Sequence, residues 1–576
     1  MQLSHESPTP RRINGVASAV AAMLGGILIA ILPHLIEHLH HGTWSYIVDP
    51  DERLCYLPAI SHSYAVHPWK LGDPALPTGG VSIYPWMQFV PAILLGKAIH
   101  IGPLGILFLL RIWAGASLGL ISYLLGRELL GRALPALFVA LMFLMDDGVT
   151  DGRPMDRTVV KLIELTRPAS GLLSEEWVPY LRQYRLITPG NSWFFMGLFV
   201  LLLLRARRLE TRSSTAWTAG AFGLLFYVYF YYWTAAGATL VLLCLFDRPR
   251  WRRYVAVGLG GALLGLPALL ANSSAKHTQG EGWLQRLDLF LPVHHFDGIL
   301  IPKVAWLYCL AAGAWIWHRH RDLLPLWCLG VSGLVLANHQ LVTGLQIQND
   351  HYIFIWGISI FLLVSILVVR ALQSRFTGRG GLPAAAVVAL AFYSASVICF
   401  RIKESNNNLE IVRTRTDLQT FRNDRREHAV FASNAVIAGD IGFTDFAVIL
   451  DGQRALAGSL ALSHSVNDTD WRRRRLLDQL VAGQSVDDAS SQADSYYGCF
   501  WTSRRRSQTE MDAEFALRQT TARDLLQHLE KSLDHYQVQY IAVLRDRKTP
   551  VAGLASWHAL PGGQRWQIWE RNTPPR

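Results

Sequence analysis

The sequence predicts a mainly α-helical protein that crosses a membrane many times and carries a soluble α/β domain at its carboxyl end. Of the 576 residues, 51% are hydrophobic and only 17% are charged, whereas a soluble domain usually carries about a quarter charged residues. Apolar runs of spanning length recur along the first 400 positions. The 20 tryptophans are expected of a protein whose rings anchor at the boundary between lipid and water.

About eleven apolar segments are predicted to span the membrane. They are residues 13–33, 105–125, 131–147, 192–205, 215–231, 232–247, 253–271, 302–318, 323–344, 352–371 and 382–401. The stretch 215–246 has no polar turn, and we divide it because a single helix of that length would overshoot the bilayer. The segment 84–100 is also apolar, but Pro85, Pro91 and Lys97 favour a helix that lies on the outer surface.

Basic residues predict the orientation of these spans. With the amino terminus in the cytoplasm, all the basic clusters near the spans fall on the cytoplasmic side, as positively charged loops usually do. The clusters are Arg11 and Arg12, Arg127 and Arg132, Arg205 to Arg212, Arg248 to Arg253, His318 to Arg321, and Arg370 to Arg379. An odd number of spans then leaves the carboxyl terminus outside. We therefore expect a membrane domain over 1–402 and an extracytoplasmic domain over 403–576, in a multi-pass protein of a bacterial inner membrane.

The carboxyl-terminal tail has the pattern of a compact α/β domain. Strands are predicted at 429–433, 446–450, 540–544 and 566–569, and helices at 471–482 and 511–536, the second with apolar positions at helical spacing. Two arginine runs, Arg472 to Arg475 and Arg504 to Arg506, are conspicuous. They are predicted to form solvated faces, or alternatively to contact anionic lipid headgroups or a glycan.

Two groups of carboxylates follow spans on the predicted outer side. Asp49, Asp51 and Glu52 come just after the first span, and Asp146 and Asp147 come at the end of the third. Charge at the edge of a bilayer costs free energy unless it meets water, a metal or a partner. Asp51, Asp146 and Asp147 together have the hard oxygen ligands of a divalent cation such as Mg²⁺ or Mn²⁺. One carboxylate can instead serve as a general base towards a hydroxyl group. The alternative is that both groups are solvated ends of helices and loops.

The order of these motifs resembles the GT-C superfamily, polytopic glycosyltransferases that use lipid-linked sugars. In that superfamily an anchor helix precedes an outer loop with an acidic motif, here Asp51-Glu52 followed by Tyr56. YPWMQFVPAILLGKAIHIG is similar to the surface helix that follows, and LLRIWAGASLGLISYLLGRELLG to the second span. RLITPGNSWFF, from Arg185, is similar to the entry to a later span. The tail lacks the two tryptophans and aspartate of oligosaccharyltransferase catalytic subunits, which argues against block transfer to asparagine.

The resemblance implies an inverting transfer from a polyprenyl-phosphate or polyprenyl-pyrophosphate sugar to a glycan, lipid or protein acceptor on the outer face. Asp51 matches the catalytic base, with Glu52 and Asp49 as substitutes. The departing phosphate needs charge stabilisation, and a forked guanidinium suits that task. The donor-phosphate candidates are Arg185, His351, Arg401 and Lys403. Arg185 can equally be a residue that snorkels at a helix end, and His351 can equally belong to a plain polar connector.

Polar and aromatic residues supply candidates for contacts with sugar hydroxyls and rings. Gln346, Gln348 and Asp350 lie beside His351 in a short outer loop. Tyr231 and Trp233 belong to the run YVYFYYW, whose rings can stack on a sugar or, as is more usual, form an interfacial belt.

Two other classes of function stay open at this point. A transporter or flippase would also have many spans, but broken helices, paired repeats and mid-membrane charges are not evident. A non-catalytic membrane scaffold would not need two acidic groups. The net charge of +11 is explained by topology, so nucleic acid is not an expected partner, whereas membrane lipids are.

Overall fold

The computed structural model describes ten of the eleven predicted membrane segments and most of the carboxyl-terminal domain. The described residues are 9–41, 56–65, 68–69, 71, 86–145, 190–276, 289–292, 303–347, 350–375, 431, 435–440, 442–444, 453–457, 466–491, 507–561 and 565–572. The predicted span at 382–401 and the predicted domain boundary at 402 lie outside this set.

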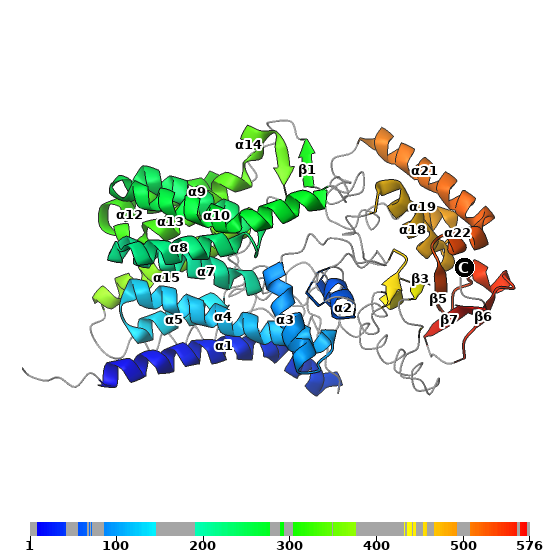
Figure 1. Ribbon diagram of the computed structural model, residues 1–576, viewed down its shortest axis with the longest axis horizontal. Helices are drawn as coiled ribbons and strands as arrows, with labels where there is room; N and C mark the ends of the chain where they lie inside the picture. Colours follow the sequence, from blue (N-terminus) through cyan, green and yellow to red (C-terminus); the bar gives the residue numbers. More distant parts are fainter. Residues whose placement is uncertain are drawn as a thin grey trace, which may run out of the picture.

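Long helices form the membrane bundle at the left of Figure 1. In chain order they are α1 (Thr9–His41), α4 (Pro103–Leu130), α5 (Ala133–Met145), α7 (Ser192–Leu209), α8 (Arg212–Leu225), α9 (Phe230–Phe246), α10 (Trp251–Lys276), α12 (Lys303–Arg319), α13 (Leu324–Ala337) and α15 (Asp350–Arg375). Each coincides with a predicted span. Within the described residues, the segments Pro103–Leu130, Arg248–Ala271 and His351–Ala371 are long and apolar enough on their own to cross a membrane.

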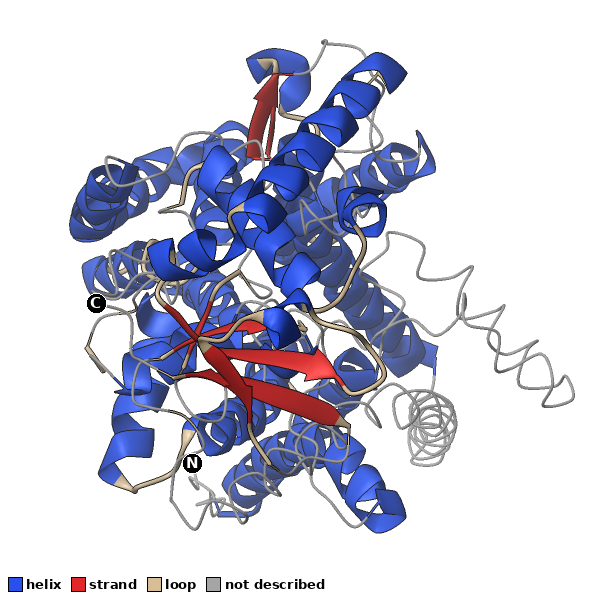
Figure 2. Ribbon diagram, turned by 90° about the vertical axis from the view of Figure 1, so that its right-hand side faces the viewer, coloured by secondary structure: helices blue, strands red, loops and turns tan. Residues whose placement is uncertain are grey.

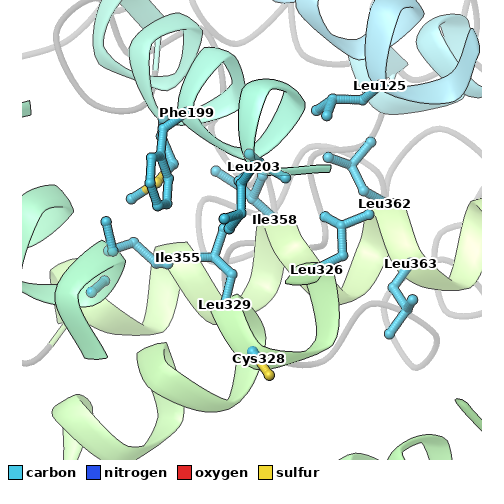
Figure 3. Close-up of a cluster of buried hydrophobic side chains, with 14 of the residues drawn as sticks. Leu125, Phe199, Leu203, Leu326, Cys328, Leu329, Ile355, Ile358, Leu362 and Leu363 are labelled. Carbon is cyan, nitrogen blue, oxygen red and sulfur yellow. The ribbon is translucent and has the colours of Figure 1, made fainter. Parts of the chain in front are cut away.

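The core of the bundle lies where α7, α13 and α15 meet. Figure 3 shows Phe199 and Leu203 of α7 facing Leu329 of α13 and Ile355 and Ile358 of α15, and all five side chains are buried. In lipid, helices associate mainly through van der Waals packing of this kind. The packing fixes the start of α15 relative to α7.

Small residues allow α1 and α4 to approach closely. A β-carbon on Gly26 of α1 would stand 1.9 Å from the carbonyl oxygen of Gly115 in α4. A β-carbon on Gly119 would stand 2.1 Å from the carbonyl oxygen of Ala22. Gly115 and Gly119 are four residues apart and so share one face of the helix. This is the small-xxx-small pattern that brings membrane helices into backbone contact.

The short turns after α4, α7, α9 and α12 gather at one end of the bundle, which we call the arginine end; it comprises residues 131–132, 210–211, 247–250 and 320–323. Arg370 of α15 donates a hydrogen bond to the carbonyl oxygen of Leu129 (2.7 Å) and forms an ion pair with Asp322. Arg207 donates to the carbonyl oxygen of Arg321 at 2.6 Å. The predicted arginine clusters of these turns therefore do lie on one side of the bundle.

Asp247 is the most densely bonded carboxylate described at the arginine end. It accepts hydrogen bonds from Arg207 Nε (2.7 Å), Arg250 (3.1 Å) and the Tyr254 hydroxyl (2.6 Å). Burial raises the pKa of Asp247, but the hydrogen bonds from Arg207 and Tyr254 and the two arginine charges outweigh burial and hold the pKa below its ordinary value. The ion pairs thus tie the α7, α9 and α10 ends together.

The opposite end of the bundle, which we call the loop end, carries two short helices. These are α2 (Leu57–Ala65) and α3 (Trp86–Ala98). The first turn of α3 bonds to residues 226–229, the connection between α8 and α9: Met87 N–H donates to the carbonyl oxygen of Tyr227 (3.3 Å), and the Gln88 amide donates to that of Val228. The helix α3 confirms that a helix forms within the segment 84–100.

The connection between α8 and α9 differs from the prediction in position. The break falls at 226–229 rather than between 231 and 232. The chain turns there without glycine, proline or a charged residue, through bonds from Tyr227 N–H to the carbonyl oxygen of Leu224 and from Val228 N–H to that of Leu225. Because α3 satisfies two of the carbonyl groups, an aromatic sequence can make this turn. A similar difference divides the predicted span 323–344, where α13 ends at Ala337 and the short α14 (Gln340–Thr343) follows.

The carboxyl-terminal domain is built on a five-stranded mixed sheet with the order β4-β3-β5-β7-β6 (Figure 2). The strands are β3 (Val436–Gly439), β4 (Arg454–Ala455), β5 (Val538–Leu544), β6 (Trp557–Ala559) and β7 (Trp566–Arg571). β3 is parallel to β4 and β5, whereas β7 is antiparallel to β5 and β6. β5 and β7 confirm the strands predicted at 540–544 and 566–569. The strand predicted at 446–450 lies outside the described residues, as does all but Phe431 of the one at 429–433.

Helices pack on one face of this sheet. They are α18 (Asp468–Val481), α19 (Val486–Ser491), α21 (Gln508–Gln527) and α22 (Leu529–His535). α18 confirms the helix predicted at 471–482. The helix predicted at 511–536 is divided at His528, which leaves the helical conformation. Leu476, Leu480 and Leu533 pack with Ile541 and Val543 of β5 in the core beneath these helices.

The prediction that Arg472 to Arg475 form a solvated face is wrong for most of the run. Arg472 pairs with Glu514 of α21 at 3.1 Å, and Arg474 pairs with Asp470 at 2.9 Å. Arg475 is only 6% exposed. These arginines form ion pairs inside the domain, because α18 lies between the sheet and α21. The run Arg504 to Arg506 lies outside the described residues.

The other face of the sheet packs on the loop end of the bundle. One buried hydrophobic cluster contains Ile437, Ala542 and Ile568 from the sheet together with Phe89 of α3 and Leu110 of α4. In Figure 1, α2 and α3 lie between the bundle and the sheet. The domain is therefore held at the end of the bundle that lies away from the arginine end.

Candidate functional site

Many of the predicted site residues lie outside the described part of the chain. These are Asp49, Asp51, Glu52, Asp146, Asp147, Arg185, Gln348, Arg401 and Lys403, together with the side chains of Gln346 and Asp350. The backbone of Gln346 is described, in β2 (Leu345–Ile347), where it faces Leu291 of β1 (Leu289–Pro292). His351, Tyr231 and Trp233 are described with their side chains.

The chain that follows the acidic run is anchored at the loop end. Tyr56, five residues after Asp51 in the sequence, lies with its ring 5.8 Å from that of Phe89 in α3. Leu57 and Ile60 of α2 are fully buried in the cluster shared with the carboxyl-terminal sheet. The first outer loop is thus joined to the same end of the bundle as α3 and the 226–229 connection.

His351 occupies the first turn of α15 and is held by two tyrosines. Its Nδ1 lies 2.5 Å from the hydroxyl oxygen of Tyr229. Its ring stacks on that of Tyr231, with a centroid separation of 4.5 Å and an interplanar angle of 22°. Tyr229 belongs to the connection bonded to α3, so the imidazole is positioned from the first-loop side as well as from α9. The contact couples the tautomer of the imidazole to the orientation of the Tyr229 hydroxyl, which can donate to Nδ1 or accept from it.

Tyr352 packs against Tyr231, the residue whose ring stacks on His351. Their rings are 5.0 Å apart and nearly perpendicular, and the Tyr352 hydroxyl lies 3.0 Å from Thr234 Oγ1. Tyr231 is 6% exposed and Tyr352 is 2% exposed. Tyr231, a predicted sugar-binding residue, thus offers one ring face to His351 and is otherwise enclosed.

Trp233, the second aromatic candidate for a sugar contact, stacks on Phe226. The ring centroids are 4.6 Å apart and the planes differ by 12°. Phe230 packs edge-on against the same indole at 5.4 Å. One face of Trp233 is therefore occupied by the chain itself.

Sequence reasoning missed three contributors to this end of the bundle. Tyr229 and Ser192 were not singled out, although the Ser192 hydroxyl bonds to that of Tyr232 at 3.2 Å and Tyr229 holds His351. Arg111 was noted only within the motif of the second span, yet it is 2% exposed inside the apolar helix α4. A lone arginine within an apolar run is the signal that marks such a position.

The described residues hold no cluster of three or more His, Cys, Asp or Glu side chains that could bind a metal ion. The carboxylates predicted as metal ligands, Asp51, Asp146 and Asp147, are outside that part of the chain. The Mg²⁺ or Mn²⁺ site therefore stays a prediction.

Known structures share this architecture, although comparison of the sequence alone finds no match. No protein-family model matches the sequence, and no relative is found among curated proteins. The structure superposes on the crystal structure of ArnT from Cupriavidus metallidurans, bound to undecaprenyl phosphate, with a TM-score of 0.52 at 12% identity. The match covers 96% of this chain and 97% of ArnT. The chain has the GT-C fold.

The GT-C fold was the expectation from the order of the sequence motifs, and the likeness to ArnT spans bundle and carboxyl-terminal domain together. Two further structures are similar at lower scores. Arabinofuranosyltransferase AftD from Mycobacteria has a TM-score of 0.47 at 13% identity, over 99% of this chain and 40% of AftD. The apo oligosaccharyltransferase of Archaeoglobus fulgidus has a TM-score of 0.46 at 13% identity, over 94% and 70% of the two chains.

Proposed function

We propose that the protein is a GT-C glycosyltransferase that transfers a sugar from a polyprenyl-phosphate or polyprenyl-pyrophosphate donor to a glycan, lipid or protein acceptor. The observation that carries this proposal is His351, fixed by Tyr229 and Tyr231 at the loop end, where the acidic first loop also joins the bundle. The fold agrees, because the ArnT structure that shares it was solved with undecaprenyl phosphate.

In the proposed reaction Asp51 takes the proton from an acceptor hydroxyl group as that oxygen attacks the anomeric carbon. The bond between this carbon and the phosphate oxygen breaks, and the configuration inverts. The electron pair of that bond leaves with the polyprenyl phosphate. Glu52 and Asp49 are the substitutes for Asp51 as the base.

His351 suits the stabilisation of the departing phosphate. It lies in the first turn of α15, and the N-terminal end of a helix carries partial positive charge. Tyr229 and Tyr231 fix the imidazole before the reaction, so the transition state gains its hydrogen bond without reorganisation of the ring. Arg185 is the second candidate for this phosphate, with Arg401 and Lys403 after it.

We propose that the loop end and the carboxyl-terminal domain face the periplasm, with the arginine end in the cytoplasm. Support comes from the grouping of Arg205, Arg207, Arg370 and their neighbours at one end of the bundle. Cytoplasmic loops are the ones enriched in arginine and lysine. The donor's isoprenoid chain would then lie in the bilayer and its phosphate would reach the loop end.

Replacement of Asp51 by Asn tests the proposed function. Because the amide cannot accept the acceptor's proton, sugar transfer from the lipid-linked donor is expected to fall by a factor on the order of 10² or more. Transfer is measured with purified protein and an isoprenyl-phosphate sugar. Asp512→Asn, on the exposed side of α21, is the matched control and is expected to keep full activity. Wild-type rates in a well-folded Asp51→Asn protein would overturn the proposed role of Asp51.

A further inference from the structure

The arginine end of the bundle carries more positive charge than its carboxylates neutralise. Each carboxylate described at this end already pairs with one or two arginines: Glu128 with Arg205 and Arg208, Glu210 with Arg250 and Arg253, Asp247 with Arg207 and Arg250, and Asp322 with Arg370. Within the described part of the chain, Arg248 and Arg321 form no ion pair, and both are exposed. These two arginines can therefore offer their charge to an anion from outside the protein.

Arg207 brings these two arginines into neighbouring turns. Its Nε donates to Asp247, the residue before Arg248, at 2.7 Å, and its Nη1 donates to the main-chain oxygen of Arg321 at 2.6 Å. One guanidinium thus joins the turn between α9 and α10 to the turn between α12 and α13. Because like charges repel, holding Arg248 beside Arg321 costs free energy that a bound anion would offset.

Aromatic rings border this pair of arginines. The guanidinium carbon of Arg321 lies 4.8 Å from the centroid of the Trp317 ring, and its Nε donates to the Trp317 carbonyl oxygen at 3.1 Å. The Trp317 ring meets that of Phe246 edge-on at 6.2 Å, and the two residues are 39% and 38% exposed. Partly exposed tryptophans at helix ends are typical of the boundary between hydrocarbon and headgroups. We call Phe246, Arg248, Trp317 and Arg321 the headgroup strip.

The headgroup strip suits the phosphodiester of a lipid better than a soluble anion. The forked donors of a guanidinium bind phosphate oxygens in pairs. Stacking and the Nε bond hold Arg321 in place, and its two terminal nitrogens make no hydrogen bond to any residue that the structure describes. Trp317 and Phe246 offer apolar surface to glycerol and to the first carbons of acyl chains, whereas a soluble anion would leave both rings without a contact.

We infer that the headgroup strip binds an anionic phospholipid, with Arg248 and Arg321 on its phosphate and with Trp317 and Phe246 on its glycerol and acyl chains. The ends of α9 and α12 that carry the strip lie at the left of the bundle in Figure 1, away from the carboxyl-terminal domain. The bound lipid offsets the repulsion between the two turns and takes no part in sugar transfer. The inference is therefore independent of the proposed function.

Lipid binding by the purified full-length protein tests the inference. Thermal unfolding in detergent is followed as phosphatidylglycerol is added, with phosphatidylcholine as the zwitterionic lipid and inorganic phosphate as the anion that lacks lipid. Wild type is expected to gain more stability from phosphatidylglycerol than from phosphatidylcholine, and high salt should reduce the difference because it screens charge at a surface. Arg248→Gln and Arg321→Gln are each expected to weaken phosphatidylglycerol binding about fivefold.

Arg132→Gln is the matched control. Arg132 is exposed at the same end of the bundle and has no ion pair among the described residues, but it belongs to the turn between α4 and α5. The change removes the same charge from a position outside the headgroup strip, so the affinity for phosphatidylglycerol is expected to stay close to that of wild type. Arg321→Gln keeps the main-chain oxygen that accepts from Arg207, and unfolding temperatures in phosphatidylcholine report whether each variant is folded.

Several results would overturn the inference. Wild type that gains no more stability from phosphatidylglycerol than from phosphatidylcholine has no site for an anionic lipid. Equal losses of affinity in Arg132→Gln, Arg248→Gln and Arg321→Gln would show a diffuse effect of charge, and unchanged affinity in both strip variants would exclude the headgroup strip. If inorganic phosphate alone stabilises the wild type and both strip variants lose this effect, the strip binds free anions. None of these results bears on sugar transfer, which Asp51→Asn tests separately.

Discussion

The hydroxyl of Tyr229 and the ring of Tyr231 decide where His351 stands. Tyr229 and Tyr231 lie two positions apart, in the turn and at the start of α9, whereas His351 of α15 is 122 residues from Tyr229. His351 could be proposed from the sequence because it is an ionisable residue in a polar loop beside a span. Tyr229 could not, since seven consecutive positions with six aromatic rings give no sign of which one makes a polar contact.

Tyr229→Phe removes the hydrogen bond to His351 and keeps the ring packing. We expect the maximal transfer rate to fall about five- to tenfold, because a neutral hydrogen bond contributes about 1 kcal/mol. The unfolding temperature should change little. Steady-state kinetics with the lipid-linked donor provide the measurement.

The same turn supplies the control for this variant. The Tyr227 hydroxyl donates instead to the carbonyl oxygen of Leu264 in α10 at 3.0 Å. Tyr227→Phe is therefore expected to leave the rate unchanged. Equal rates for the two phenylalanine variants would show that the Tyr229 hydroxyl does not act through His351.

At the scale of elements, the periodicity and length of apolar runs predicted the helices well, and their ends less well. The predicted position of the break at 226–229 was wrong because donors in α3 satisfy the carbonyl groups that the break exposes. One of these donors, Gln88, lies 140 residues before its acceptor Val228 in the sequence. The strand β3 was not predicted, because four small and apolar residues between loops give no alternating pattern that marks a strand.

The contact between α1 and α4 yields a prediction at this scale. A β-carbon on Gly115 would stand 2.3 Å from the carbonyl oxygen of Gly26, so Gly115→Ala has to force the two helices apart. We expect a loss of about 1–3 kcal/mol in stability, measured as a lower unfolding temperature in detergent or a lower midpoint of denaturation by sodium dodecyl sulphate.

Gly220 in α8 provides the matched comparison, because a β-carbon there would meet no atom within 4 Å. Gly220→Ala is expected to be neutral or slightly stabilising, since alanine favours a helix over glycine. If Gly115→Ala is as stable as Gly220→Ala, the close approach of α1 and α4 is not part of the native packing.

At the scale of the whole molecule, the carboxyl-terminal domain depends on buried charge as well as on apolar packing. Glu514 of α21 pairs with Arg472 and with Arg518, which is 1% exposed. Burial raises the pKa of Glu514, but the two arginines and their hydrogen bonds outweigh burial and lower the pKa below its ordinary value. The sequence showed the arginine run, but not that two of its acidic partners, Glu514 and Asp524, come from α21.

Glu514→Gln is expected to destabilise the protein by on the order of 2 kcal/mol at neutral pH, because Arg518 loses a buried partner. A carboxyl group with a lowered folded pKa contributes stability above its unfolded pKa, about 4.3, and loses it as pH falls through the folded pKa. The difference between wild type and variant should therefore shrink below about pH 4. Thermal unfolding of the full chain across pH, with Asp512→Asn as the exposed control, measures it; a difference independent of pH would contradict the ion-pair account.

The bonds from α3 to the 226–229 connection have a consequence for how this protein can vary. Both acceptors there are main-chain oxygens, those of Tyr227 and Val228, and every amino acid supplies one. Substitution of one aromatic residue by another at 226–229 therefore leaves the acceptors of these two hydrogen bonds from α3 unchanged. Substitutions in the ring cluster can thus change the surroundings of His351 while the main-chain contacts between α3 and the 226–229 connection stay in place.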